Sequence, residues 1–160
     1  MKKFILCCIP QPKDSEAIES LIGVYFQDIQ SLSENILFLQ HQQWSDVRSW
    51  LINLANKLYD TPPSFLMDST CLAEAIDCFY KSLPDDFDGD KYDFMIDELY
   101  EFRVNHDLRF AFRGTDIPSV LIGLYKNNLT VSWVNKLGQY EHQIISQIYW
   151  NDTPISQISA

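Results

Sequence analysis

The spacing of apolar residues changes on either side of an acidic stretch, residues 85–103, and this change most constrains the fold. Before the stretch, apolar residues recur mainly at helical spacing; after it, they alternate as in half-buried strands. We therefore predict an α+β fold in which a helical N-terminal half packs on an antiparallel β-meander in the C-terminal half. The 160 residues suffice to bury one core, so we expect a single globular domain over residues 1–150 and a polar, frayed tail over residues 151–160.

A short apolar run at residues 3–9 opens the chain, and Pro10 closes it. The run is shorter than the apolar region of a secretory signal peptide, and no small-residue cleavage site follows it. We interpret it as a buried first strand. A helix is predicted next, beginning at Asp14 or Ser15, which are good N-cap residues. Its apolar stripe consists of Ile18, Leu21, Ile22, Tyr25 and Ile29.

Two further helices are predicted before the acidic stretch. Residues 35–40 form a short apolar run that fits either a strand or a helix. A helix then begins near Ser45 and ends at the two prolines that follow Thr61, because proline cannot continue the hydrogen-bond ladder. The last of these helices begins near Ser69 and ends at Pro84.

Alternating apolar residues predict strands in the back half of the chain. Asn127 and Asn128 indicate a two-residue hairpin, since asparagine tolerates the positive φ that such turns need. Residues 139–150 fit a helix and a strand almost equally, and a helix is preferred. The predicted strands lie at residues 108–113, 120–126 and 129–133.

The acidic stretch itself predicts an amphipathic helix over residues 91–103. At 3.6 residues per turn, the apolar residues gather on one side and the acids on the other. One aromatic residue, Phe94, falls among the acids. Carboxylates that precede or open the helix are favourable there because the N-terminal end of the helix dipole is positive.

This acidic side suits a docking surface, in which the acids steer and orient a basic partner and Phe94 fills a pocket. The ordinary alternative is a solvated helix face without a partner. The predicted binding residues, which we call the acidic ridge, are Asp86, Asp88, Asp90, Asp93, Phe94, Asp97, Glu98 and Glu101.

The overall charge limits the kinds of partner. The chain carries a net charge of -10, so phosphate backbones and anionic lipid repel it. We therefore expect neither nucleic acid nor a membrane as a partner, and a basic protein is favoured. No stretch of the sequence is long and apolar enough to span a bilayer.

A calcium loop is the metal site that the sequence most nearly imitates. Asp86, Asp88 and Asp90 match the first, third and fifth ligand positions of an EF-hand. Lys91 stands where the loop needs glycine, and Asp97 stands where it needs a bidentate glutamate. These departures argue against calcium, and we expect no metal.

The sequence offers no catalytic or cofactor motif: it lacks a nucleophile elbow, a glycine-rich phosphate loop and a zinc-protease helix. We therefore expect neither enzymatic activity nor a cofactor. Arg109 and Arg113 share the outward side of the predicted strand 108–113, where we expect them to pair with the acidic helix or stay solvated rather than bind an anion. The cysteines form no C-x-x-C pair, which favours free thiols in the reducing cytoplasm.

In length, charge, acidic amphipathic helix and hairpin-rich C-terminal half, the chain resembles the immunity proteins of contact-dependent inhibition and related polymorphic toxin systems of bacteria. No shared motif carries this resemblance. It implies tight binding to one cognate toxin domain, often a basic nuclease, whose active site the immunity protein blocks as a charge mimic of nucleic acid. The alternative is an acidic cytosolic secretion chaperone or adaptor, which binds an effector without inhibiting an enzyme.

Overall fold

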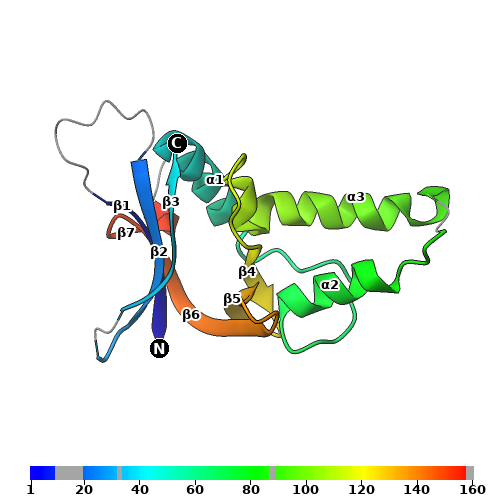
Figure 1. Ribbon diagram of the computed structural model, residues 1–160. Helices are drawn as coiled ribbons and strands as arrows, with labels where there is room; N and C mark the ends of the chain where they lie inside the picture. Colours follow the sequence, from blue (N-terminus) through cyan, green and yellow to red (C-terminus); the bar gives the residue numbers. More distant parts are fainter. Residues whose placement is uncertain (10–19, 32–33, 87–88, 158–160) are drawn as a thin grey trace.

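The computed structural model describes residues 1–9, 20–31, 34–86 and 89–157 (Figure 1). In this part of the chain, strands β1–β3 come first, helices α1–α3 follow, and strands β4–β7 come last. The elements are β1 (Lys2–Ile9), β2 (Ser20–Asp28), β3 (Glu34–Gln42), α1 (Trp44–Lys57), α2 (Leu72–Ser82), α3 (Gly89–His106), the 3-10 helix η1 (Leu108–Phe110), β4 (Val120–Tyr125), β5 (Asn128–Val134), β6 (Tyr140–Trp150), β7 (Thr153–Pro154) and the 3-10 helix η2 (Ile155–Gln157).

The strands form one curled sheet in the order β3-β2-β1-β6-β5-β4, and β7 pairs with β6. The long strand β6 joins the two halves of the sheet. Its residues from Tyr140 to Ile144 pair antiparallel with β5, whereas those from Ile145 to Trp150 pair parallel with β1. Figure 1 shows the resulting bend of β6 between the two halves.

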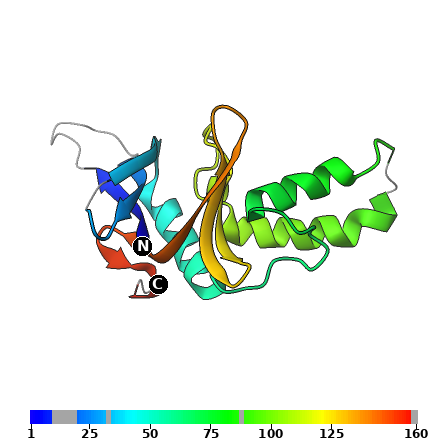
Figure 2. The ribbon, with the colours of Figure 1, turned by 90° about the horizontal axis from the view of Figure 1, so that it is seen from below.

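Two hydrophobic cores lie on opposite faces of the β4–β5 hairpin. Val120 and Ile122 of β4 face the larger core, which also contains the inner residues of β1, β2 and α1. Leu121, between them, faces a smaller core formed with α2 and α3. The alternation follows from the period of two in a strand. In Figure 2, α1 lies between the two halves of the sheet, and α2 and α3 lie beyond the hairpin.

The predicted arrangement of a helical N-terminal half and a C-terminal meander is wrong, because three strands precede the first helix. Residues 20–28, which we predicted as part of a helix, form β2, with β1 on one side and β3 on the other. Ile22, Val24 and Phe26 are buried at alternate positions of this strand. Ile18 lies outside the described residues. β-branched and aromatic residues suit such a half-buried strand.

Three other predictions also need correction. Residues 108–110 form η1 rather than a strand, and the Asp107 side chain accepts a hydrogen bond from the backbone N–H of Arg109 at its start. Residues 140–150 form β6 rather than a helix. The hairpin turn consists of Lys126 and Asn127, one residue earlier than predicted, with φ of 48° and 64°.

The first strand, the three helices after residue 44 and the β4–β5 hairpin are confirmed. Residues 35–40, which fitted a strand or a helix, belong to β3. The described part of the expected tail, residues 151–157, contains β7 and η2. There the Asn151 side chain accepts a hydrogen bond of 2.8 Å from the backbone N–H of Cys8, and Ile155 is buried in the larger core.

We predict that Gly123→Ala lowers the free energy of unfolding by about 1–3 kcal/mol, the usual cost of overpacking a core. A Cβ atom at Gly123 would lie 2.9 Å from Cδ2 of the buried His106 ring. The measurement is urea unfolding followed by tryptophan fluorescence. Gly89→Ala is the matched control, because its nearest contact is 3.4 Å, to the Asp93 carboxylate. Equal stability of the two variants would contradict the prediction.

Candidate partner-binding surface

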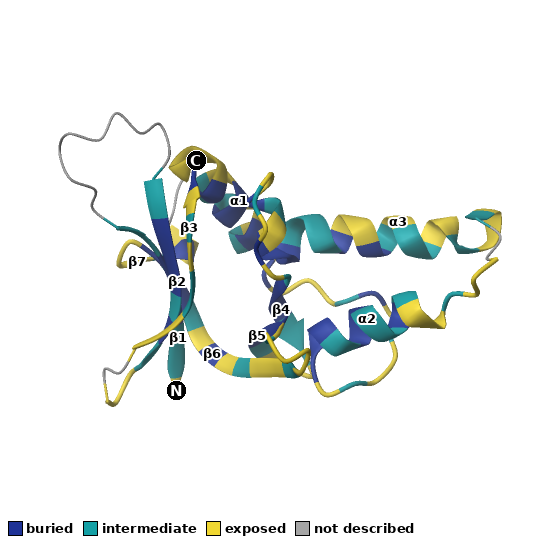
Figure 3. Ribbon diagram, viewed as in Figure 1, coloured by how far each residue is buried: buried dark blue, intermediate teal, exposed yellow. Residues whose placement is uncertain are grey.

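Helices α2 and α3 form an arm that projects away from the strands (Figure 1). The C-terminal end of α3 lies against β4 and α1, and its N-terminal end lies at the tip of the arm. Burial follows the same direction: residues near the base are buried, whereas those near the tip are exposed or half-buried (Figure 3). Asp90, in the first turn of α3, therefore lies at the tip of the arm.

The two predicted sides of the acidic helix are confirmed in α3. Leu99 and Phe102 are buried in the smaller core, and Met95 and Ile96 pack against it. Phe94 points away from this core, with 77% of its surface exposed. An aromatic ring so exposed in the middle of a helix contributes little to folding and is available to a partner.

Most of the acidic ridge shares this outward side. Asp90, Asp93, Asp97 and Glu101 are exposed on α3, and Glu98 is half-buried at its edge. Phe94 lies among them. Two members of the ridge precede α3: Asp86 is exposed, and Asp88 lies outside the described residues.

The carboxylates of α3 are not neutralised by the arginines near its C-terminal end. Arg103 and Arg109 both form ion pairs with the buried Asp107, at 2.9 and 3.6 Å. The Arg113 guanidinium lies over the Phe110 ring, 5.7 Å from its centroid. Among the described residues, no ion pair involves the acids listed here: Asp93, Asp97, Glu98 and Glu101. Their charge is therefore available to an external cation.

A small cavity of about 160 Å³ lies beside the ridge, between α3 and the end of α1. Glu98 and Glu101 line it from α3, and Lys57 and Asp60 line it from the opposite side. With three acids and one base, the cavity is suited to the tip of a basic side chain rather than to an anion.

His106 forms the inner end of this cavity and is almost completely buried. Its Nδ1 lies 2.8 Å from the carbonyl oxygen of Phe102, and its Nε2 lies 3.0 Å from that of Lys57. The ring also stacks on Phe102 with centroids 4.0 Å apart. Burial lowers the pKa of His106 below its ordinary value, although the two carbonyl contacts act in the opposite direction.

We therefore expect the free energy of unfolding to fall as the pH falls below about 6.5, the ordinary pKa of histidine. The unfolded chain then binds a proton that the folded His106 resists, so stability is complete above this pH and is lost towards the lower pKa of the folded state. One such proton gives a slope of at most about 1.4 kcal/mol per pH unit.

The measurement is urea unfolding at a series of pH values between 5 and 8. His106→Gln should flatten the profile between pH 6.5 and 5. His142→Gln, which removes a histidine from an exposed position of β6, is the matched control. A profile that keeps its slope in His106→Gln would show that another group is responsible.

The described residues contain no cluster of metal-ligating side chains and no helix suited to span a membrane. No group of three or more histidine, cysteine or acidic side chains among them could hold a metal ion. The calcium-loop comparison falls partly on Asp88, outside the described residues. Within the same ranges, no helix combines the length and the apolar character needed to cross a membrane.

Sequence reasoning missed a larger cavity of about 450 Å³ on the side of α3 that faces α2. Arg103 and Arg109 line it together with residues of α2, β4 and β6. The one local signal was the spacing of Arg103 and Asp107, four residues apart, which allows an ion pair across one helical turn.

No protein-family model matches the chain, and neither a curated protein nor a solved structure matches it. A function must therefore be inferred from the chemistry and the geometry of the described surfaces.

Proposed function

We propose that the chain is a cytoplasmic bacterial immunity protein that binds and neutralises a basic toxin domain, a nuclease, through the acidic ridge. The observation that supports this most is the row of exposed acids on a projecting helix, where Asp93, Asp97 and Glu101 form no ion pair among the described residues and Phe94 is exposed beside them. The four cysteines, Cys7, Cys8, Cys71 and Cys78, are free thiols, which fits a reducing compartment.

The geometry of α3 suits competition with a nucleic acid. Asp93, Asp97 and Glu101 follow one another at intervals of four residues, so each lies about 6 Å further along the helix axis. A nuclease has a positive active-site surface because its substrate is a chain of phosphates. A rigid row of carboxylates can occupy that surface, and long-range attraction speeds the encounter.

Phe94 would supply the part of the affinity that does not depend on charge. Aromatic residues near the centre of an interface commonly anchor it by filling a pocket, and the surrounding polar contacts exclude water. Asp90, Asp97 and Glu101 surround Phe94 on the same side of α3. This arrangement has the apolar centre and the polar rim of a specific interface.

A secretion chaperone or adaptor is the second candidate, and the edge of the sheet favours it. β3 is the edge strand beside β2, and it exposes Ile36 and Leu39 by 66% and 49%. An exposed edge with apolar side chains can accept an extended segment of another protein as an additional strand. A partner held in this way would be kept soluble without loss of its own activity.

The test is affinity capture with the tagged chain from a lysate of its source organism, washed at low and then at high salt. We expect one basic protein to remain bound at high salt, because a specific interface keeps its apolar anchor when charges are screened. Its nuclease activity should then fall in proportion to the amount of chain added, up to a ratio of one to one.

A captured protein that keeps its activity in the complex would favour the chaperone. Capture that is lost completely at high salt, or no capture at all, would indicate that the ridge is only a solvated helix side.

A further inference from the structure

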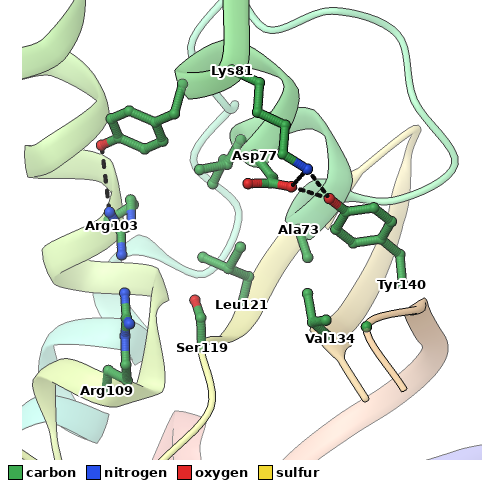
Figure 4. A pocket seen from close by; sticks show the side chains of 12 residues that line it. Ala73, Asp77, Lys81, Arg103, Arg109, Ser119, Leu121, Val134 and Tyr140 are labelled. Atoms are coloured by element: carbon green, nitrogen blue, oxygen red, sulfur yellow. Dashed lines mark hydrogen bonds and ion pairs between the residues drawn. The ribbon is translucent and has the colours of Figure 1, made fainter. Parts of the chain in front are cut away.

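The larger cavity, of about 450 Å³, lies between α2, α3, η1 and the β4–β6 half of the sheet (Figure 4). Its volume is within the range of sites that bind small molecules. The residues around it come from segments far apart in the chain, so only the packing of the arm against the sheet brings them together.

One wall of the cavity is cationic. Arg103 of α3 and Arg109 of η1 lie next to each other there (Figure 4), and both approach Oδ2 of the buried Asp107. Two guanidinium groups thus share a single carboxylate, which leaves one positive charge in excess. Among the buried side-chain nitrogens and oxygens of the described residues, Nε of Arg103 alone has no hydrogen-bond partner. This wall is therefore short of an acceptor.

The opposite wall is close to neutral. Asp77 of α2 accepts hydrogen bonds from Tyr140 and from Lys81, the latter at 2.6 Å. These two donors lower the pKa of Asp77, with Lys81 as the larger cause, so the carboxylate and the ammonium group offset each other. The excess charge on the arginine wall is therefore not cancelled across the cavity.

The space between the two walls is mostly apolar. Ile76 of α2, Leu121 of β4 and Val134 of β5 line it, and the Tyr80 ring stands beside Arg103, with its hydroxyl 3.4 Å from Nη1. Ser119 lies near the arginines, where its hydroxyl donates to Asp107. The site thus combines an apolar body with a cationic end, a common design for a ligand that carries one charged group.

We propose that this cavity binds a small organic monocarboxylate, whose carboxylate lies on Arg103 and Arg109 and whose apolar part packs against Ile76 and Leu121. A guanidinium fork matches the two oxygens of a carboxylate. A single excess positive charge suits a monoanion better than a doubly charged phosphate. Through this site, a strongly acidic chain would bind a metabolite that is itself negatively charged.

This site does not depend on the acidic ridge. Arg103 faces α2, whereas the ridge occupies the outward side of the same helix. A toxin bound to Phe94 and Asp97 would leave the cavity in place. A result that excludes the ridge as the toxin interface therefore says nothing about the cavity, and a result that excludes carboxylate binding says nothing about the ridge.

The experiment is isothermal titration of the full chain with benzoate, benzyl alcohol, benzylamine and phenyl phosphate, which carry the same ring with different charges. We expect measurable binding of benzoate, weaker binding of phenyl phosphate, and none of the neutral or cationic probes. Benzoate that binds no better than benzyl alcohol would overturn the proposal. Tighter binding of phenyl phosphate would overturn the assignment of a monocarboxylate.

Two variants test the position of the site. Arg109→Gln should weaken benzoate binding at least about tenfold, the effect of one charge-assisted hydrogen bond. Val134→Phe, at a partly exposed position of the lining, should block binding without a change in charge. Arg113→Gln removes the same charge at an exposed position outside the cavity and should bind benzoate as the wild type does.

Circular dichroism of each variant confirms that it is folded before titration. Equal losses in Arg109→Gln and Arg113→Gln would show that benzoate responds only to overall charge, and this result would also overturn the proposal.

Discussion

Asp107→Ala is expected to lower the free energy of unfolding by about 3–5 kcal/mol, the cost of removing one partner from a buried ion pair. The Asp107 carboxylate is completely buried and lies 2.9 Å from Nη2 of Arg103. It also accepts hydrogen bonds of 2.8 Å from the Ser119 hydroxyl and 3.1 Å from the backbone N–H of Arg109. The substitution removes the common acceptor of these three donors.

The cost is large because Arg103 cannot lose its charge. Burial acts to lower the pKa of Arg103, but its hydrogen bonds to Asp107 and Tyr80 outweigh burial and raise the pKa. An arginine stays protonated at any pH at which the protein is folded. Without Asp107, the Arg103 side chain, which is only 17% exposed, has lost its closest countercharge. Water can reach its guanidinium fully only if η1 or the arm unfolds in part.

Urea unfolding, monitored through the fluorescence of the buried Trp50 and Trp133, measures the effect. Asp60→Ala is the matched control, since Asp60 also pairs with a basic residue of the preceding turn, Lys57, but both side chains are about half exposed. We expect that control to change stability by less than about 1 kcal/mol. A similarly small change in Asp107→Ala would mean that the buried pair does not hold the base of the arm.

The elements that could be predicted are those whose buried residues recur at the regular spacing of a helix or a strand. α1 and α2 each bury one side, β4 alternates between two cores, and β5 turns every second residue to the larger core, so local periodicity was sufficient. β2 was mistaken for a helix because Leu21, Ile22 and Tyr25 also fit helical spacing. β2 is a strand because it pairs with β1 and β3, and this pairing involves residues that are distant in sequence.

β6 shows a second physical reason for failure. Its buried residues Ile145 and Ile148 are three positions apart, which is a helical spacing. The strand reaches this spacing through a register shift: Lys2 pairs with Ile145, but Lys3 pairs with Gln147. A bulge of this kind changes which residues face the core, and its position cannot be predicted from the local sequence.

The acidic ridge could be predicted from the sequence and the larger cavity could not, and the reason is again the distance in sequence between the residues involved. The acidic ridge lies on one helix, so the spacing of Asp93 and Asp97 was enough to place them on one side. The larger cavity needs residues from α2, α3, η1 and the strands β4, β5 and β6, such as Asp77 and Tyr140, which are 63 positions apart. Arg109 was expected on a strand beside the acidic helix. Its true place in η1, next to Asp107, follows from the tertiary fold.

Asp93→Lys combined with Asp97→Lys is expected to weaken binding of the captured toxin by at least about 100-fold, if the ridge is the interface. Close charge pairs across an interface are coupled by about 1.5–7 kcal/mol, and reversal turns each attraction into repulsion. Both residues are exposed on α3 and form no ion pair within the described chain. The free energy of unfolding should therefore change by less than about 0.5 kcal/mol. Titration calorimetry and urea unfolding of the same preparations measure the two quantities.

Asp46→Lys combined with Asp116→Lys is the matched control, because it makes the same change in net charge at exposed positions on α1 and before β4. Loss of binding in both double variants would mean that overall charge, rather than the ridge, attracts the partner. Retention in both would exclude α3 as the interface.

Phe94→Ala separates the contribution of the aromatic anchor from that of the charges. It should weaken toxin binding at least tenfold, on the order of the loss at an interface hot spot. This loss should persist at high salt, because it arises from a buried apolar contact.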